Sequence, residues 1–233
     1  MSGEFVAPDR RPTATGSVIA LAFVLAGVGT LTDDATQLLV VAVEAGCLLC
    51  VGVGRFLQGR GRSYAGRSMV FVGFLGQLLA VGAAASVPER LDEQVILVVG
   101  LVGVVLYLLG LYPLRRAQSR QFLNAGTGIC ILAIFVAALF REASVLRIAV
   151  ASTATLVGWN VGGQAITLGR RVGRAAETKR VEGVRTVGNV SVGTVLVASV
   201  AVGNGVAPTR IPTVALTLLL TTAVVLLISL IKL

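Results

Sequence analysis

Long apolar runs alternate with short charged segments along almost the whole chain. Eight of these runs approach the length of about 20 residues that an α-helix needs to cross the hydrocarbon core of a bilayer. They cover about residues 17–32, 36–57, 66–87, 94–112, 122–140, 145–168, 187–206 and 211–231. The pattern predicts an all-α fold, a polytopic transmembrane helix bundle with eight spans. Tyr107 and Tyr112 are expected to anchor the fourth span near an interface.

The composition is that of an integral membrane protein. Hydrophobic residues make up 55% of the 233 residues, charged residues only 13%, and the mean hydropathy is +0.90. Soluble domains contain about 25% charged residues. The polar segments between the runs are too short for a separate soluble domain. We therefore expect a disordered leader at residues 1–16, followed by a single membrane domain at residues 17–233.

Basic residues are unevenly divided between the two sets of loops that alternate along the chain. With a cytoplasmic N-terminus, 16 of the 20 Lys and Arg residues fall on the inner side of the membrane and four on the outer side. Loops rich in Lys and Arg stay on the cytoplasmic side during insertion. The sequence therefore predicts a multi-pass protein of the cell membrane with both termini in the cytoplasm.

The inner segment at residues 169–186 carries the densest group of basic residues. It contains good helix formers and no proline, so we expect a helical cytoplasmic loop. Its basic residues are Arg170, Arg171, Arg174, Lys179, Arg180 and Arg185. They are candidates for binding anionic lipid headgroups or a cytoplasmic protein partner. The alternative is a solvated connecting helix whose charges only fix the topology.

The residue types that most enzymes and metal sites require are scarce. The chain has no histidine, which is the commonest general base and the commonest metal ligand. We therefore predict no catalytic residue, no metal site and no cofactor. Nucleic-acid binding is not predicted either, despite a net charge of +9, because the basic residues flank apolar runs without interleaved aromatic residues.

Three cysteines lie inside apolar runs. Cys47 and Cys50 form a C-x-x-C pattern in the second span, and Cys130 lies in the fifth. Membrane enzymes that exchange disulfides use two cysteine pairs, and Cys130 alone cannot supply the second pair. Burial in lipid also hides a thiol from its partners. Small apolar packing residues are the preferred interpretation, and a membrane redox enzyme is disfavoured.

Four polar residues inside the apolar runs are candidates for an intramembrane site: Glu44, Gln77, Asn160 and Gln164. Glu44 is the only ionisable residue well inside a span, about 12 Å below the outer surface at about 1.5 Å per residue. An acidic side chain at that depth is costly and is a functional candidate, as a proton relay or a cation site. The structural alternative is a protonated carboxyl that hydrogen-bonds to a polar group such as Gln77 or Asn160.

Small residues recur at intervals of four in several spans. They are Ala42, Gly46, Cys50 and Gly54 in the second span, Gly76, Ala80 and Ala84 in the third, Gly126 and Cys130 in the fifth, and Ala154, Gly158 and Gly162 in the sixth. Ridges of small residues allow two helix backbones to approach closely, which favours association in lipid. We expect these ridges to be the contact faces of their helices.

The segment WNVGGQAITLGRRVGRAAETKRVEGV, residues 159–184, resembles a sequence pattern of an uncharacterised multi-pass membrane family of haloarchaea. The pattern is a span that ends in G-x-x-A-I-x-L-G, followed by Arg, then Glu-Thr-x-Arg, and then a further span. Genes of that family often neighbour those of MoxR-type AAA ATPases, which implies an accessory role in an envelope complex. The chain departs from the family at Val184 and Arg185, where a histidine is expected.

Two functions therefore stay open. The first is a non-enzymatic membrane scaffold or accessory subunit of an envelope complex, with a cytoplasmic ATPase or other membrane subunits as partners. The second is a small transporter or channel in which Glu44, Gln77 and Asn160 line a path.

Overall fold

The computed structural model of the chain describes residues 12–88, 90–112, 118–140, 143–172 and 179–206. These residues form seven α-helices and no strand. The helices are α1 (Ala14–Gly29), α2 (Ala35–Gly59), α3 (Ser63–Ala84), α4 (Leu91–Leu111), α5 (Ser119–Phe140), α6 (Val145–Val172) and α7 (Lys179–Val206). They match the first seven predicted runs in order, so the all-helical prediction is confirmed. The eighth predicted span, residues 211–231, lies outside the described residues.

Five of these helices, α2 to α6, are long and apolar enough to cross a membrane. The helix α1 has only 16 residues, which extend about 24 Å, less than a hydrocarbon core of about 30 Å. The apolar part of α7 is restricted to Thr186–Val202, because its first turns carry basic residues. The described helices therefore support five spans by length and composition, and the predicted number of eight is not supported.

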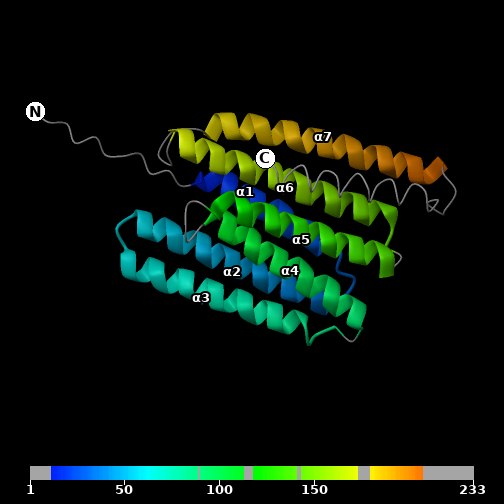
Figure 1. Cartoon of the computed structure of the whole chain (residues 1–233), viewed down its shortest axis with the longest axis horizontal. Helices are drawn as coiled ribbons and strands as arrows, with labels where there is room; N and C mark the ends of the chain where they lie inside the picture. Colours follow the sequence, from blue (N-terminus) through cyan, green and yellow to red (C-terminus); the bar gives the residue numbers. More distant parts are fainter. Residues whose placement is uncertain (1–11, 89, 113–117, 141–142, 173–178, 207–233) are drawn as a thin grey trace, which may run out of the picture.

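Successive helices run in opposite directions, so their ends gather at two opposite ends of the bundle (Figure 1). We call one the basic end. It holds the α2–α3 turn, the start of α1 and α5 and the end of α6, with Arg60, Arg62, Arg67, Arg120 and Arg170. We call the other the acidic end. It holds the α1–α2 turn and the start of α4, with Asp33, Asp34, Asp92 and Glu93.

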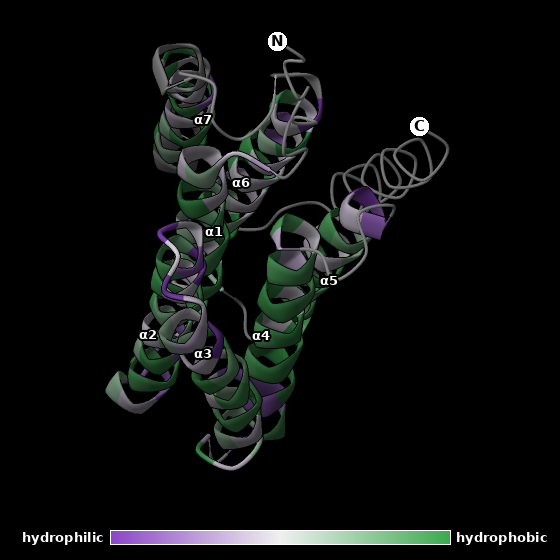
Figure 2. Ribbon diagram, turned by 90° about the vertical axis from the view of Figure 1, so that its left-hand side faces the viewer, coloured by the Kyte–Doolittle hydropathy of each residue, from purple (hydrophilic) through white to green (hydrophobic). Residues whose placement is uncertain are grey.

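The helices are arranged in two layers. Figure 2 shows α7, α6, α1 and the α2–α3 pair following one another, with α4 and α5 packed along one side of that row. The short helix α1 contacts α2, α4, α5, α6 and α7. The helix α1 is surrounded by other helices. Its unpaired backbone groups are therefore shielded from lipid even though the helix is too short to reach both membrane surfaces.

Three helix pairs make the most extensive contacts: α2 with α3, α4 with α5, and α1 with α6. Glycines stand where a side chain would strike the neighbouring backbone. A Cβ atom at Gly126 of α5 would lie 2.5 Å from the backbone nitrogen of Tyr107, and one at Gly158 of α6 would lie 3.0 Å from the backbone oxygen of Ala20. Such close backbone approach is what stabilises helix pairs where water is absent.

The pairing of α1 with α6 joins segments far apart in the sequence. Besides the contact at Gly158, the backbone N–H of Thr13 donates a hydrogen bond to the carbonyl oxygen of Ala165, at 3.2 Å. This bond ties the start of α1 to the C-terminal half of α6. The first helix of the chain is therefore held by the sixth, while its sequence neighbour α2 packs chiefly against α3.

The predicted small-residue ridges form contact faces in α3, α5 and α6, but the ridge predicted for α2 is wrong. Ala42 and Gly46 are exposed, and a Cβ atom at Gly46 would meet nothing within 4 Å. The helix contacts α3 through Cys47, Val51 and Gly54 instead. Gly54, the last member of the predicted ridge, is the only one of its residues that is buried.

The rotation of α2 follows from its polar residues. Gln37 is 2% exposed and Glu44 is 0% exposed, and both lie on the stripe that faces the bundle. Polar side chains that face hydrocarbon are costly, so the orientation that buries both residues is favoured over the one that buries the ridge. Large apolar residues occupy the opposite faces of α2 and α3, with Leu39 66% exposed and Phe71 69% exposed, as expected for surfaces that face lipid.

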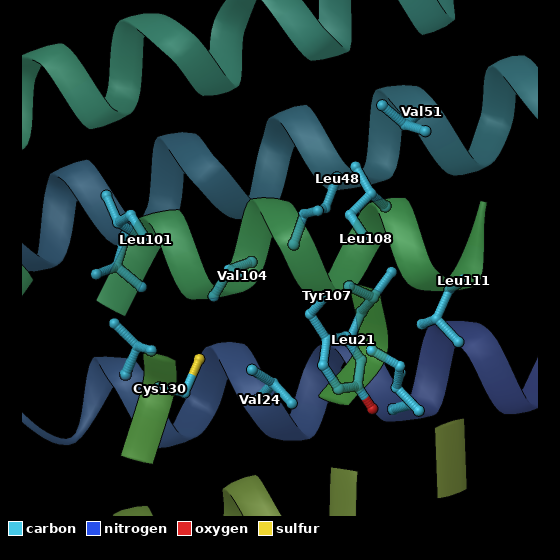
Figure 3. Packing of buried hydrophobic residues seen from close by; sticks show 14 of the residues in the cluster. Leu21, Val24, Leu48, Val51, Leu101, Val104, Tyr107, Leu108, Leu111 and Cys130 are labelled. Atoms are coloured by element: carbon cyan, nitrogen blue, oxygen red, sulfur yellow. The ribbon is translucent and has the colours of Figure 1, made fainter. Parts of the chain in front are cut away.

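Tyr107 of α4 stands at the centre of the hydrophobic core (Figure 3). It is 0% exposed, and its hydroxyl donates a hydrogen bond of 2.5 Å to the carbonyl oxygen of Gly158 in α6. Leu21 of α1, Leu48 of α2 and Leu108 of α4 belong to the same cluster. The expectation that Tyr107 anchors α4 at an interface is therefore wrong, because its polar group has a buried partner on another helix.

We predict that Gly126→Ala lowers the stability of the protein by about 1–3 kcal/mol, because the new methyl group would press on backbone atoms of α4. Gly163→Ala in α6 is the matched control, since nothing lies within 4 Å of a Cβ atom there. Alanine is favoured over glycine inside a helix, so this control should be neutral or stabilising by up to about 1 kcal/mol. Unfolding titrations in mixed micelles measure both, and equal effects would contradict the prediction.

Candidate functional site: buried polar groups between the helices

Glu44 lies on the buried face of α2, inside the bundle. Its side chain is 0% exposed, and neither carboxylate oxygen has a hydrogen-bond partner. The buried residues of α2 recur at positions 37, 40, 41, 44, 48, 51 and 54, which is the spacing of one helix face. Glu44 is therefore held in the core by the amphipathic pattern of α2, surrounded by apolar residues and without a compensating group.

Gln77 of α3 is in the same situation. It is 0% exposed, and neither its amide nitrogen nor its carbonyl oxygen has a partner. The Sγ atom of Cys47 lies where a side chain at Gly76 would stand, which sets the register of the α2–α3 pair. Gln77 follows Gly76, and Glu44 precedes Cys47 by three residues. The two polar side chains are thus at a similar depth on two contacting helices, with no hydrogen bond between them.

Asn160 and Gln164 lie elsewhere, on the face of α6 toward α7. The amide nitrogen of Gln164 donates to the side-chain oxygen of Asn160 at 3.1 Å, and the amide nitrogen of Asn160 donates to Asn189 of α7 at 3.0 Å. Among the described helices, α6 packs against α1, α5 and α7, and it makes no extensive contact with α2 or α3. The four predicted polar residues therefore lie in two separate places, Glu44 and Gln77 on α2 and α3 and Asn160 with Gln164 on α6, and do not converge on one site.

A third polar group, at the acidic end, was missed by the sequence analysis. The amide nitrogen of Gln37 in α2 donates to a carboxylate oxygen of Glu93 in α4 at 2.6 Å, and the backbone N–H of Asp33 donates to the amide oxygen of Gln37 at 3.3 Å. Asp33 also forms an ion pair with Arg147 of α6. We call this group the acidic-end network. It joins the α1–α2 turn to α2, α4 and α6.

One signal in the sequence points to this network. Gln37 precedes Glu44 by seven residues, so two turns of helix place both on the same face. The carboxylate of Glu93 lies in the first turn of α4, where the helix dipole favours a negative charge. The predicted fourth span begins at about residue 94, whereas α4 starts at Leu91 and buries Glu93 to 9% exposure.

The predicted basic residues that the structure describes lie at the end of α6 and at the start of α7. Arg170 is exposed near the end of α6, and Arg171 follows it in the same helix. Lys179, Arg180 and Arg185 lie near the start of α7, and Arg174 lies outside the described residues. The predicted helical loop is helical on both sides of residues 173–178, because α6 continues to Val172 and α7 begins at Lys179.

The thiols are placed as packing residues. Cys47, Cys50 and Cys130 are all free, and the Sγ atom of Cys130 lies 3.8 Å from the carbonyl oxygen of Gly100. Within the described part of the chain, no group of three or more His, Cys, Asp or Glu residues is placed to hold a metal ion. The polar chemistry of these helices is therefore that of carboxyl and amide groups.

Comparison with known proteins places the chain in a family. A family of unknown function, DUF7519, matches residues 74–227. The chain belongs to this family. No curated protein and no solved structure matches the chain. The DUF7519 match begins within α3 and continues through α4, α5, α6 and α7.

The candidate groups fall on both sides of the boundary of the DUF7519 match. Gln77, the Tyr107–Gly158 hydrogen bond and the Asn160–Asn189 pair lie inside the matched residues. Glu44 and Gln37 precede them. The Gln37–Glu93 hydrogen bond therefore joins α2 to the DUF7519 region, while Glu44 and Gln77 lie on opposite sides of its boundary without a bond between them.

We predict that Gln37→Leu destabilises the protein by about 1–2 kcal/mol, because it removes a buried hydrogen bond to a carboxylate. Gln164→Leu is the matched control. It removes an exposed hydrogen bond between residues four apart on one helix, which contributes about 0.2–0.5 kcal/mol. Unfolding titrations in mixed micelles compare the two variants. A Gln37→Leu protein no less stable than Gln164→Leu would show that the acidic-end network does not stabilise the fold.

Proposed function

We propose that this DUF7519 protein is a non-enzymatic integral membrane scaffold, an accessory subunit of an envelope complex that spans the membrane with both termini in the cytoplasm. Support comes from the long helices α2 to α6 and from the large apolar side chains exposed on α2 and α3. A transporter path lined by Glu44, Gln77 and Asn160 is less well supported, because Asn160 is bonded to α7 and lies away from Glu44 and Gln77.

The observation that carries the proposal is the separation of charge between the two ends of the bundle. Five arginines, Arg60, Arg62, Arg67, Arg120 and Arg170, are exposed at the basic end. At the acidic end the described basic residues are Arg90, which is exposed, and Arg147, which is paired with Asp33, beside the carboxylates of Asp33, Asp34, Asp92 and Glu93. Lys and Arg concentrate on the cytoplasmic side of membrane proteins. The basic end is therefore proposed to face the cytoplasm, where its guanidinium groups meet anionic lipid headgroups.

The same end is the proposed docking surface for a partner. The segment from Arg170 to Arg185 extends α6 and α7 beyond their apolar parts, and it carries six basic residues. An AAA ATPase of the MoxR type is the proposed cytoplasmic partner. This choice rests on the resemblance of residues 159–184 to the haloarchaeal membrane family, and the basic surface supports it by offering charge for an acidic patch.

We predict opposite accessibility for the two ends of α3. Ser63 and Ser86 flank this helix at the basic and acidic ends, and both are exposed. A membrane-impermeant maleimide should label Ser86→Cys in intact cells and Ser63→Cys only after permeabilisation, because the basic end is inside. The unmodified chain is the control, since its cysteines lie within spans. Labelling of Ser63→Cys in intact cells would contradict the proposed orientation.

We predict that reversing Arg170, Arg171 and Arg174 to Glu reduces copurification of the ATPase by about tenfold or more, equivalent to about 1.4 kcal/mol of binding free energy. Reversing Arg60, Arg62 and Arg67 makes the same change of charge at the α2–α3 turn and is the matched control. The maleimide assay checks that both variants keep their orientation. Undiminished copurification, or equal loss in both variants, would contradict docking at the α6–α7 segment.

A further inference from the structure

The turn between α2 and α3, at the basic end of the bundle, carries positive charge that the fold itself does not use (Figure 1). Arg60, Arg62 and Arg67 are exposed, and none of them forms an ion pair within the described part of the chain. The sequence gives the reason, because the chain contains no Asp or Glu between Glu44 and Glu89. The three guanidinium groups are therefore available to an anionic ligand from outside the chain.

The backbone of the turn is short and ordered. The backbone N–H groups of Arg60 and Arg62 both donate hydrogen bonds to the carbonyl oxygen of Leu57, each at 3.1 Å. Gly61 lies between the two arginines with a φ of 83°, a left-handed conformation that glycine adopts without strain. The arginines are therefore presented by a fixed turn, which lowers the cost of ordering them around a ligand.

Aromatic side chains place this turn at the level of the lipid headgroups. The helix α2 has 25 residues, which extend about 37 Å, more than the hydrocarbon thickness of about 30 Å. Phe56 is 55% exposed and Tyr64 is 89% exposed, and exposed tyrosines concentrate at the membrane interface. The guanidinium group of Arg60 lies 4.4 Å from the centroid of the Phe56 ring, so a cation–π contact orients it.

An apolar surface continues from the turn along α3. Phe71 is 69% exposed, Leu75 is 49% exposed and Leu78 is 66% exposed. Their spacing of four and three residues places them on one face of the helix, and Tyr64 precedes Phe71 by seven residues on the same face. A ligand at this place meets guanidinium groups at one end and a long apolar surface at the other.

Given the proposed placement in the membrane, we propose that the α2–α3 turn is a binding site for an anionic phospholipid. The phosphate group lies among Arg60, Arg62 and Arg67, whose planar guanidinium groups match phosphate oxygens in pairs. The acyl chains lie along the exposed face of α3, which a soluble phosphate ester would leave uncovered. The α6–α7 segment and its proposed ATPase partner take no part in this site.

The test compares two lipids that have the same acyl chains and different headgroups. The purified full-length chain in detergent micelles is titrated with phosphatidylglycerol or with phosphatidylcholine, and native mass spectrometry counts the bound lipid molecules. We expect phosphatidylglycerol to bind about tenfold more tightly or better, because its phosphate charge is not compensated within the headgroup. Equal affinity for the two lipids would overturn the proposal.

The triple variant Arg60→Gln, Arg62→Gln and Arg67→Gln should weaken the binding of phosphatidylglycerol about tenfold or more and leave that of phosphatidylcholine unchanged. All three side chains are exposed, so the helix content measured by circular dichroism should stay the same. Phe56→Leu keeps an apolar side chain but removes the ring beneath Arg60. It should weaken the binding of phosphatidylglycerol about two- to fivefold.

The matched control replaces Arg170, Arg171 and Arg174 by Gln, which removes the same number of charges at the same end of the bundle. Among the described helices, α6 makes no extensive contact with α2 or α3, and the effect of a surface charge falls off over about 10 Å. This variant should therefore bind phosphatidylglycerol as the unmodified chain does. Equal loss in the two triple variants would show diffuse attraction and no site at the turn.

A soluble competitor distinguishes a lipid from a free phosphate ester. Glycerol 3-phosphate carries the phosphate without the acyl chains, so we expect it not to displace phosphatidylglycerol at equal concentration. Displacement at equal concentration would overturn the assignment to a lipid. These titrations contain no ATPase, so loss of the proposed partner would leave them unaffected, and failure of lipid binding would leave the copurification experiment unaffected.

Discussion

Helices in lipid gain little from burying apolar surface against one another, so their association depends on how closely the backbones approach. In this protein glycine at the contact positions provides that approach. Gly126 brings α5 against α4, Gly158 brings α6 against α1, and Gly66 brings α3 against α2. These three contacts fix which face of each helix lies inside the bundle, and so they also decide which polar residues are buried.

The sequence was sufficient to locate the described helices along the chain, but it did not determine which face of each helix is buried. Apolar runs and flanking charges located the first seven helices, because both signals are local. Small residues at every fourth position identified the contact faces of α5 and α6 correctly. In α2 the same spacing pointed to Gly46, which is exposed. A ridge of small residues permits contact but does not require it, and the burial of Glu44 and Gln37 decided between the two faces.

Which polar residues meet was beyond the sequence. Glu44, Gln77 and Asn160 are similar in type and in depth, yet only the first two lie on contacting helices, since the partner of a helix depends on the arrangement of the whole bundle. The acidic-end network is another case. The bond from Asp33 to Gln37 is local, but Gln37 and Glu93 are 56 residues apart and share no motif, so their hydrogen bond follows only from the packing of α2 against α4.

The pairing of α1 with α6 has a consequence for biosynthesis. Hairpins such as α2–α3 and α4–α5 join neighbours in sequence, so each is complete soon after its second helix leaves the ribosome. The first helix is translated long before α6, so the backbone N–H of Thr13 can meet the carbonyl oxygen of Ala165 only late in synthesis. The nascent chain therefore carries α1 without its main partner through most of its synthesis, and the α1–α6 pair can form only after the α2–α3 and α4–α5 hairpins have been translated.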